Sequence, residues 1–73
     1  MTEEQMQEAL YHCFAALILD ADQDEFPEGM PSELAGMEMV RTFADAGLLT
    51  SNKGVALRMK DGREFQITVV RSR

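Results

Sequence analysis

The chain has 73 residues, of which 45% are hydrophobic and 27% are charged, and its formal net charge is −6. These values exclude a disordered or low-complexity chain and predict a single small domain over residues 1–73. One cysteine and one histidine exclude a disulfide framework and a Cys/His zinc site built by one chain.

Residues 2–20 have the pattern of a helix. Thr2 and Gln5 have the spacing of a capping box. Five residues recur at three- and four-residue steps and share one helical face: Met6, Leu10, Cys13, Phe14 and Leu17. A second apolar stripe follows on another side: Tyr11, Ala15 and Ile18. A helix that is apolar almost all round needs neighbours on more than one side.

Residues 21–31 predict an acidic loop, which Pro27 and Pro31 stiffen. The acidic surface of this region consists of five residues: Asp20, Asp22, Asp24, Glu25 and Glu28. The first three stand at positions 1, 3 and 5 of a calcium-binding EF-hand loop. However, Glu25 and Pro31 occupy the positions where that loop needs Gly and a bidentate Glu. We therefore expect no metal site.

Residues 33–46 have the pattern of a second helix, with Ser32 as N-cap. Gly47 suits the C′ position, so that Leu48 falls at C″ and Phe43 at C3, the hydrophobic pair of a Schellman ending. The main apolar face contains four residues: Leu34, Met37, Val40 and Ala44. A second stripe contains four more: Ala35, Met39, Phe43 and Ala46.

Residues 55–70 alternate apolar and polar side chains around a central turn, which predicts an antiparallel β-hairpin. A two-residue turn at 61–62 would pair Arg58 with Phe65, so that a charged and an apolar side chain would share one face of the hairpin. A three-residue loop at 60–62 instead pairs Leu57 with Phe65 and puts Gly62 in the left-handed position of a G1 bulge. We predict this second register.

The predicted fold is therefore α+β, with two helices followed by a C-terminal antiparallel β-hairpin (α-α-β-β). Its elements are helix 2–20, acidic loop 21–31, helix 33–46 and hairpin 55–70. The longest uninterrupted apolar run, residues 13–19, is about a third of a membrane span. The first residues, Met-Thr-Glu-Glu, lack the basic region of a secretory signal. We expect a cytoplasmic protein with no membrane partner.

No pair of side chains is placed to share a proton. His12 and Cys13 are neighbours on the predicted helix and point about 100° apart. Cys13 falls on the main core face, where we expect a small buried hydrophobe. We therefore expect no enzyme, no catalytic residues and no cofactor.

Charge is divided along the chain. Residues 1–52 carry eleven acidic residues and one basic residue, whereas residues 53–73 carry six basic and two acidic residues. Five of the basic residues belong to the hairpin and the segment after it: Arg58, Lys60, Arg63, Arg71 and Arg73. The sequence Ala-Asp-Ala-Gly-Leu-Leu followed by a hairpin resembles the passage from recognition helix to wing in winged-helix domains. That resemblance implies that the basic hairpin contacts nucleic-acid phosphates.

The surplus apolar surface favours self-association, which would also extend the strand edge at residues 65–70. Our leading interpretation is a small non-enzymatic protein-binding or regulatory module that acts through protein contacts as a homodimer. The predicted partner or dimer interface contains six residues: Tyr11, Ile18, Ala35, Met39, Phe43 and Ala46.

Two alternatives stay open. The first is an acidic inhibitor of a basic nucleic-acid-binding machine, since small inhibitors such as phage-encoded anti-CRISPR proteins have similar size and charge. The second is a small winged-helix-like DNA-binding protein that uses the basic hairpin. The expected partner is thus a second copy or a basic protein, with nucleic acid less favoured.

Overall fold

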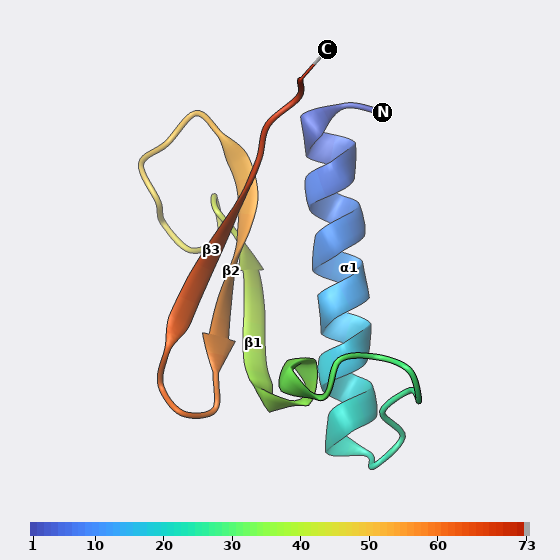
Figure 1. Ribbon diagram of the computed structural model, residues 1–73. Helices are drawn as coiled ribbons and strands as arrows, with labels where there is room; N and C mark the ends of the chain where they lie inside the picture. Colours follow the sequence, from blue (N-terminus) through green and yellow to red (C-terminus); the bar gives the residue numbers. More distant parts are fainter. Residues whose placement is uncertain (73) are drawn as a thin grey trace.

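The computed structural model describes residues 1–72 as one helix packed along one face of a three-stranded antiparallel sheet (Figure 1). The elements follow in chain order: α1 (Glu3–Asp22), the 3-10 helix η1 (Ser32–Gly36), β1 (Met37–Thr42), β2 (Lys53–Met59) and β3 (Glu64–Val69). The protein is α+β, but the predicted order α-α-β-β is wrong, because the observed order is α-β-β-β. The sheet order is β1-β2-β3.

α1 begins as predicted, with a capping box. Thr2 Oγ1 accepts from the Gln5 N–H at 3.1 Å, and Gln5 Oε1 accepts from the Thr2 N–H at 2.8 Å. Both predicted stripes contribute to one broad face against the core, formed by six residues: Leu10, Tyr11, Phe14, Ala15, Leu17 and Ile18. Cys13 is exposed, so its predicted burial is wrong. The sheet faces the boundary between the two stripes, which leaves Cys13 outside the buried arc.

The segment 33–46 is not a helix, because it contains η1, β1 and a turn. A β-bulge explains why its spacing looked helical. The register of β1 on β2 shifts between Met37 and Met39, so the bulge puts Met37 and Val40 on the same sheet face. Both are buried, with exposed fractions of 0% and 7%. A three-residue step between core residues, which is normal for a helix, here results from a bulged strand.

The predicted C-terminal signal at Gly47 is correct, although it ends a single turn. Gly47 has a φ of 75°. Its N–H donates to the Ala44 carbonyl at 3.1 Å, and the Leu48 N–H donates to the Phe43 carbonyl at 3.1 Å. These are the two hydrogen bonds of a Schellman motif. Residues 43–46 form this turn directly after β1, so the motif closes the end of the strand.

The predicted hairpin register is confirmed. Leu57 lies opposite Phe65, and Gly62 has a φ of 91°. The Met59 N–H donates to the Arg63 carbonyl at 2.8 Å, and the Gly62 N–H donates to the Met59 carbonyl at 3.0 Å. This pattern closes a three-residue loop with a G1 bulge.

Gly62→Val is expected to lower the free energy of unfolding by more than about 1 kcal/mol, because a β-branched residue resists a positive φ. Gly62→Asn should cost less, since Asn tolerates this conformation. Urea denaturation of the two variants measures the difference. Equal losses would argue against the left-handed turn.

The core lies between α1 and the sheet and contains five buried residues: Leu17, Met37, Val40, Val55 and Leu57. The opposite sheet face, which we call the open face, includes seven residues: Met39, Arg41, Ala56, Arg58, Glu64, Gln66 and Thr68. Met39 is 41% exposed there. The protein thus has two layers, with one sheet face covered.

Candidate functional site

β3 lies at an edge of the sheet, and within residues 1–72 no strand pairs with its outer side. Because the Met59 N–H donates to the Arg63 carbonyl, alternate residues of β3 direct their backbone groups toward β2. The backbone groups of three intervening residues therefore point outward: Glu64, Gln66 and Thr68. We call this side of the strand the β3 edge. It can accept another extended chain.

The apolar side chains of β3 lie on the same sheet face as α1 but are incompletely covered by it. Phe65 and Ile67 stand opposite Leu57 and Val55, which belong to the core. α1 packs mainly on β1 and β2 and touches β3 least (Figure 1). Phe65 therefore remains 52% exposed. The predicted face of Phe65 is right, but α1 does not bury it.

A shallow hollow continues this apolar strip at the end of β3. It lies between the first turn of α1 and the strand, and its lining includes Thr2, Glu3 and Arg71. Its apolar lining consists of four residues: Met1, Met6, Val69 and Val70. Val70 is 75% exposed and Met6 is 38% exposed. The β3 edge is thus bordered along its length by accessible apolar side chains.

The other edge of the sheet, at β1, is less suited to pairing. A bulge follows Met37, and such irregularities discourage edge-to-edge contacts. The Thr42 carbonyl already accepts from the Ala46 N–H at 2.9 Å. Thr42 Oγ1 accepts from the Asp45 N–H at 3.2 Å. The register of β3 on β2 is regular from Glu64 to Val69, so β3 is the better candidate.

A buried hydrogen bond holds α1 over β2. Gln7 is 6% exposed, and its Oε1 accepts from the Gly54 N–H at 2.9 Å. In a regular ladder this N–H would donate to Phe43, whose N–H donates to the Gly54 carbonyl at 3.0 Å. The Phe43 carbonyl instead accepts from Leu48. Gln7 thus satisfies a donor that the turn after β1 has displaced.

Sequence reasoning missed Gln7, because its partner is 47 positions away. Gln7→Leu is expected to lower the free energy of unfolding by about 1–3 kcal/mol, since the buried Gly54 N–H loses its acceptor. Glu8→Gln is the control, because Glu8 only accepts a 3.4 Å hydrogen bond from Gln7. Urea denaturation should show little change for this control. A stable Gln7→Leu protein would contradict the anchoring role.

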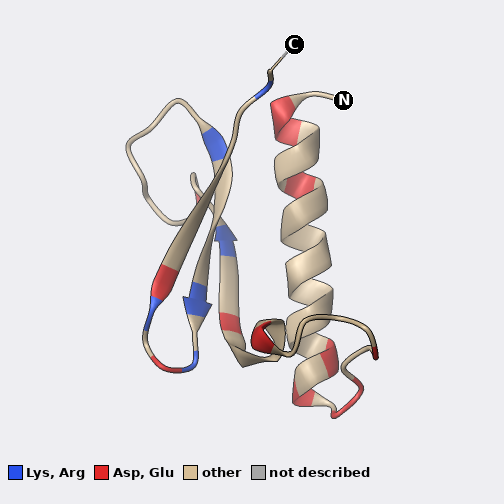
Figure 2. Cartoon of the chain, in the orientation of Figure 1, with Lys and Arg blue, Asp and Glu red and all other residues tan. Residues whose placement is uncertain are grey.

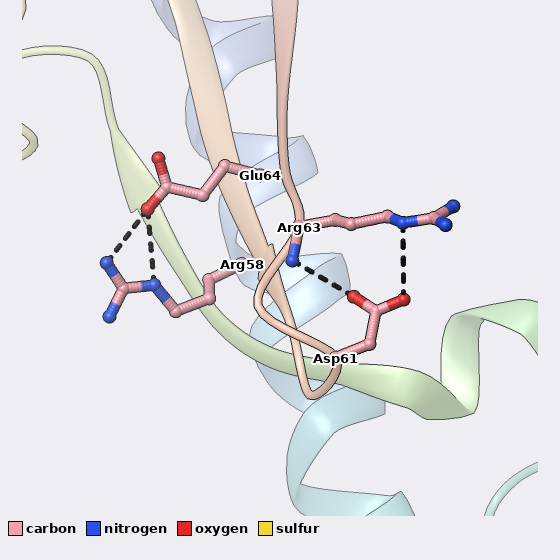
Figure 3. A network of polar contacts seen from close by, with 4 residues as sticks. All are labelled: Arg58, Asp61, Arg63 and Glu64. Carbon is pink, nitrogen blue, oxygen red and sulfur yellow. Dashed lines mark hydrogen bonds and ion pairs between the residues drawn. The ribbon is translucent and has the colours of Figure 1, made fainter.

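The basic hairpin residues do not gather into one free patch. Arg58 Nε and Nη2 donate to Glu64 Oε1 at 3.2 and 2.8 Å (Figure 3). The pKa of the Arg58 guanidinium is raised above its ordinary value. The main cause is hydrogen bonding to Glu64, and the second is the negative charge of the same carboxylate. Arg63 Nε lies 3.6 Å from Asp61 Oδ2, and Lys60 Nζ lies 4.0 Å from an Asp22 carboxylate oxygen.

The other two basic residues of this set lie beyond the hairpin. Arg71 lines the hollow at the end of β3 and has an interaction partner. Arg73 lies outside the described residues.

The six residues of the predicted interface do not share one surface. Tyr11 and Ile18 pack against the core, and Phe43 is 4% exposed. Ala35 and Ala46 are half-buried. Met39 lies on the open face. The helical stripe that joined four of these residues does not exist, because they belong to η1, β1 and the turn that follows.

The five residues of the predicted acidic surface, Asp20 to Glu28, lie at the C-terminal end of α1 and in the following loop (Figure 2). In the part of the chain that the structure describes, no three His, Cys, Asp or Glu side chains are grouped to hold a metal ion. Within residues 1–72, no helix combines the length and apolar character that a membrane span requires.

Within residues 1–72, the fold and the site define a small two-layer α+β domain in which β3 is a regular edge strand without a partner strand on its outer side. Comparisons with protein-family models, curated proteins and solved structures find no match.

Proposed function

We propose that the protein is a small non-enzymatic binding module that acts through protein–protein contacts at the β3 edge. The observation that carries this proposal is the uncovered edge itself. Its backbone groups point outward at alternate residues, and Phe65 beside them is 52% exposed. The ligand is an extended protein segment that adds as a fourth strand.

The chemistry of the edge defines the kind of segment that fits. Main-chain hydrogen bonds to β3 supply affinity, and alternate side chains supply specificity. On the side of α1, the segment meets Phe65, Ile67 and Val69, so its side chains there should be apolar. On the open face it meets Gln66 and Thr68, so polar side chains suit the intervening positions. An alternating apolar and polar strand meets both requirements.

The two alternatives gain less support. The acidic-inhibitor hypothesis depends on charge alone. The fold adds only the positions of the acidic residues. The winged-helix-like hypothesis needed a recognition helix within 33–46, where the chain forms β1 and no such helix.

A synthetic peptide with the sequence of residues 63–71 alternates polar and apolar side chains from Glu64 to Val69 and can therefore serve as a probe for binding at the β3 edge. We expect it to shift the amide resonances of β3 in the isotopically labelled full chain. Gln66→Pro should weaken binding at least tenfold, because proline removes an outward N–H without removing a bond to β2. Gln66→Thr, which keeps the N–H and favours a strand, should bind like the wild type.

A second control distinguishes binding at the β3 edge from binding at the interface that was predicted from the sequence. Met39→Glu changes the open face near the opposite edge and should leave peptide binding intact. Resonance shifts confined to Met39 and Arg41, or no shifts in β3, would overturn the proposal.

A further inference from the structure

We infer that the segment bound by the β3 edge is β3 of a second copy of this chain, paired antiparallel. Two three-stranded sheets would then form one continuous sheet, with both α1 helices on the same face. This inference rests on the proposed function, because it names the partner of the same edge.

The strand meets the symmetry requirements of such a pair. A twofold axis perpendicular to the sheet relates two antiparallel copies of one strand and keeps their faces aligned. The outward backbone groups at Gln66 and Thr68 then exchange hydrogen bonds between copies. The side chains of Phe65, Ile67 and Val69 stay together on the side of α1. A one-residue slip would turn one apolar row to the other face.

The apolar strip and the hollow beside it are complementary between copies. Phe65 stands near the start of β3, whereas the hollow lined by Met6 and Val69 lies at its end. Antiparallel pairing puts the start of one β3 beside the end of the other. Each Phe65, 52% exposed in the single chain, thereby approaches the hollow of its partner. The contact occurs twice, which favours a second copy over an unrelated chain.

Charge favours the same orientation. The hairpin tip carries Lys60 and Arg63 against Asp61, whereas the first turn of α1 carries Glu3 and Glu4 (Figure 2). The tip lies at one end of the molecule, and the first turn of α1 lies at the other, beside the end of β3 (Figure 1). Antiparallel pairing brings the basic tip of one copy to the acidic turn of the other. Parallel pairing would instead put the two hairpin tips, each with Lys60 and Arg63, side by side.

Sedimentation velocity of the full chain between about 10 µM and 1 mM tests the association. We expect a concentration-dependent dimer for the wild type, for Gln66→Thr and for Met39→Glu. Gln66→Pro should remain monomeric, with a folded circular dichroism spectrum. A monomeric wild type over the whole range overturns the inference. A Met39→Glu protein that loses the dimer while Gln66→Pro keeps it also overturns the inference, because the interface then lies on the open face.

Amide hydrogen exchange locates the contact within the strand. The outward amides of Gln66 and Thr68 should gain at least about tenfold protection as the concentration rises. The amides of Phe65 and Ile67 are bonded to β2 in the single chain and should change less. Equal protection at every concentration would contradict edge pairing.

A spin label determines the orientation. We replace Cys13 by Ser and Lys60 by Cys, attach the label at residue 60, and mix this chain with isotopically labelled wild type. If the pair is antiparallel, the spin label should broaden the amide resonances of residues 3–6 in the isotopically labelled copy. Broadening at its hairpin tip would overturn the antiparallel arrangement. Peptide binding at β3 by a chain that stays monomeric would overturn the second-copy inference alone, whereas absence of both would overturn the proposed function as well.

Discussion

Gly54→Ala is expected to lower the free energy of unfolding by about 3 kcal/mol, the upper end of the usual cost of overpacking. A Cβ atom at this position would lie 2.6 Å from Phe43 Cζ and would collide with the backbone carbonyl oxygen of Ile67. Phe43 is only 4% exposed, and the Ile67 carbonyl belongs to the strand that pairs with β2. Overpacking costs about 1–3 kcal/mol, and the core of a domain of this size rarely supplies more than about 3–5 kcal/mol. The loss should therefore consume most of the stability.

Gly36→Ala is the matched control. Its added Cβ would meet only Met59 Cε at 3.7 Å, an ordinary contact. Far-UV circular dichroism and urea denaturation should show a folded control with a midpoint close to that of the wild type. A Gly54→Ala protein with an unchanged midpoint would contradict the close packing of β2, β3 and Phe43.

The features that sequence reasoning predicted correctly are fixed by residues close together in the chain. The capping box of α1 needs only Thr2 and Gln5. The hairpin loop follows from one choice between registers, because only the three-residue loop puts Leu57 and Phe65 on the same face. The left-handed turn at Gly47 likewise depends on its immediate neighbours. Each signal acts over at most a few residues, so tertiary contacts do not override it.

The prediction of a second helix was wrong because apolar spacing does not distinguish a helix from a bulged strand. Met37 and Val40 are three residues apart and both buried, as they would be on a helix. The bulge that produces this spacing depends on pairing with β2, which comes later in the chain. Gly47 then supplied a genuine helix-ending signal, although it closes a single turn that follows a strand. The apolar spacing and the Gly47 signal were both read correctly, but together they supported a helix at 33–46 that does not exist.

The candidate site could be predicted only in part. The alternation at 65–70 indicates a strand edge, and we expected it to favour self-association. Its exposure depends on where α1 lies, and Gln7 contributes to that position through a contact 47 residues away. The interface assigned to Tyr11, Ile18 and Met39 assumed two neighbouring helices. With one helix, the first two residues cover the chain's own core.

Met37→Ala is expected to lower the free energy of unfolding by about 2–5 kcal/mol, the usual cost of removing a buried Met side chain. Met37 is 0% exposed and lies between α1 and the sheet. Met39→Ala should cost less than about 1 kcal/mol, because Met39 is 41% exposed on the open face. The two substitutions remove the same atoms two positions apart, so their difference isolates burial.

The comparison also tests the bulge. Without it, alternation in β1 would put Met37 and Met39 on the same face of the sheet, and the two substitutions would have similar costs. With it, Met37 shares its face with Val40, and Val40→Ala should also be costly, although less so because the side chain is smaller. Urea denaturation of the three variants distinguishes these cases. Similar losses for Met37→Ala and Met39→Ala would contradict the bulged register, because both side chains would then be equally buried.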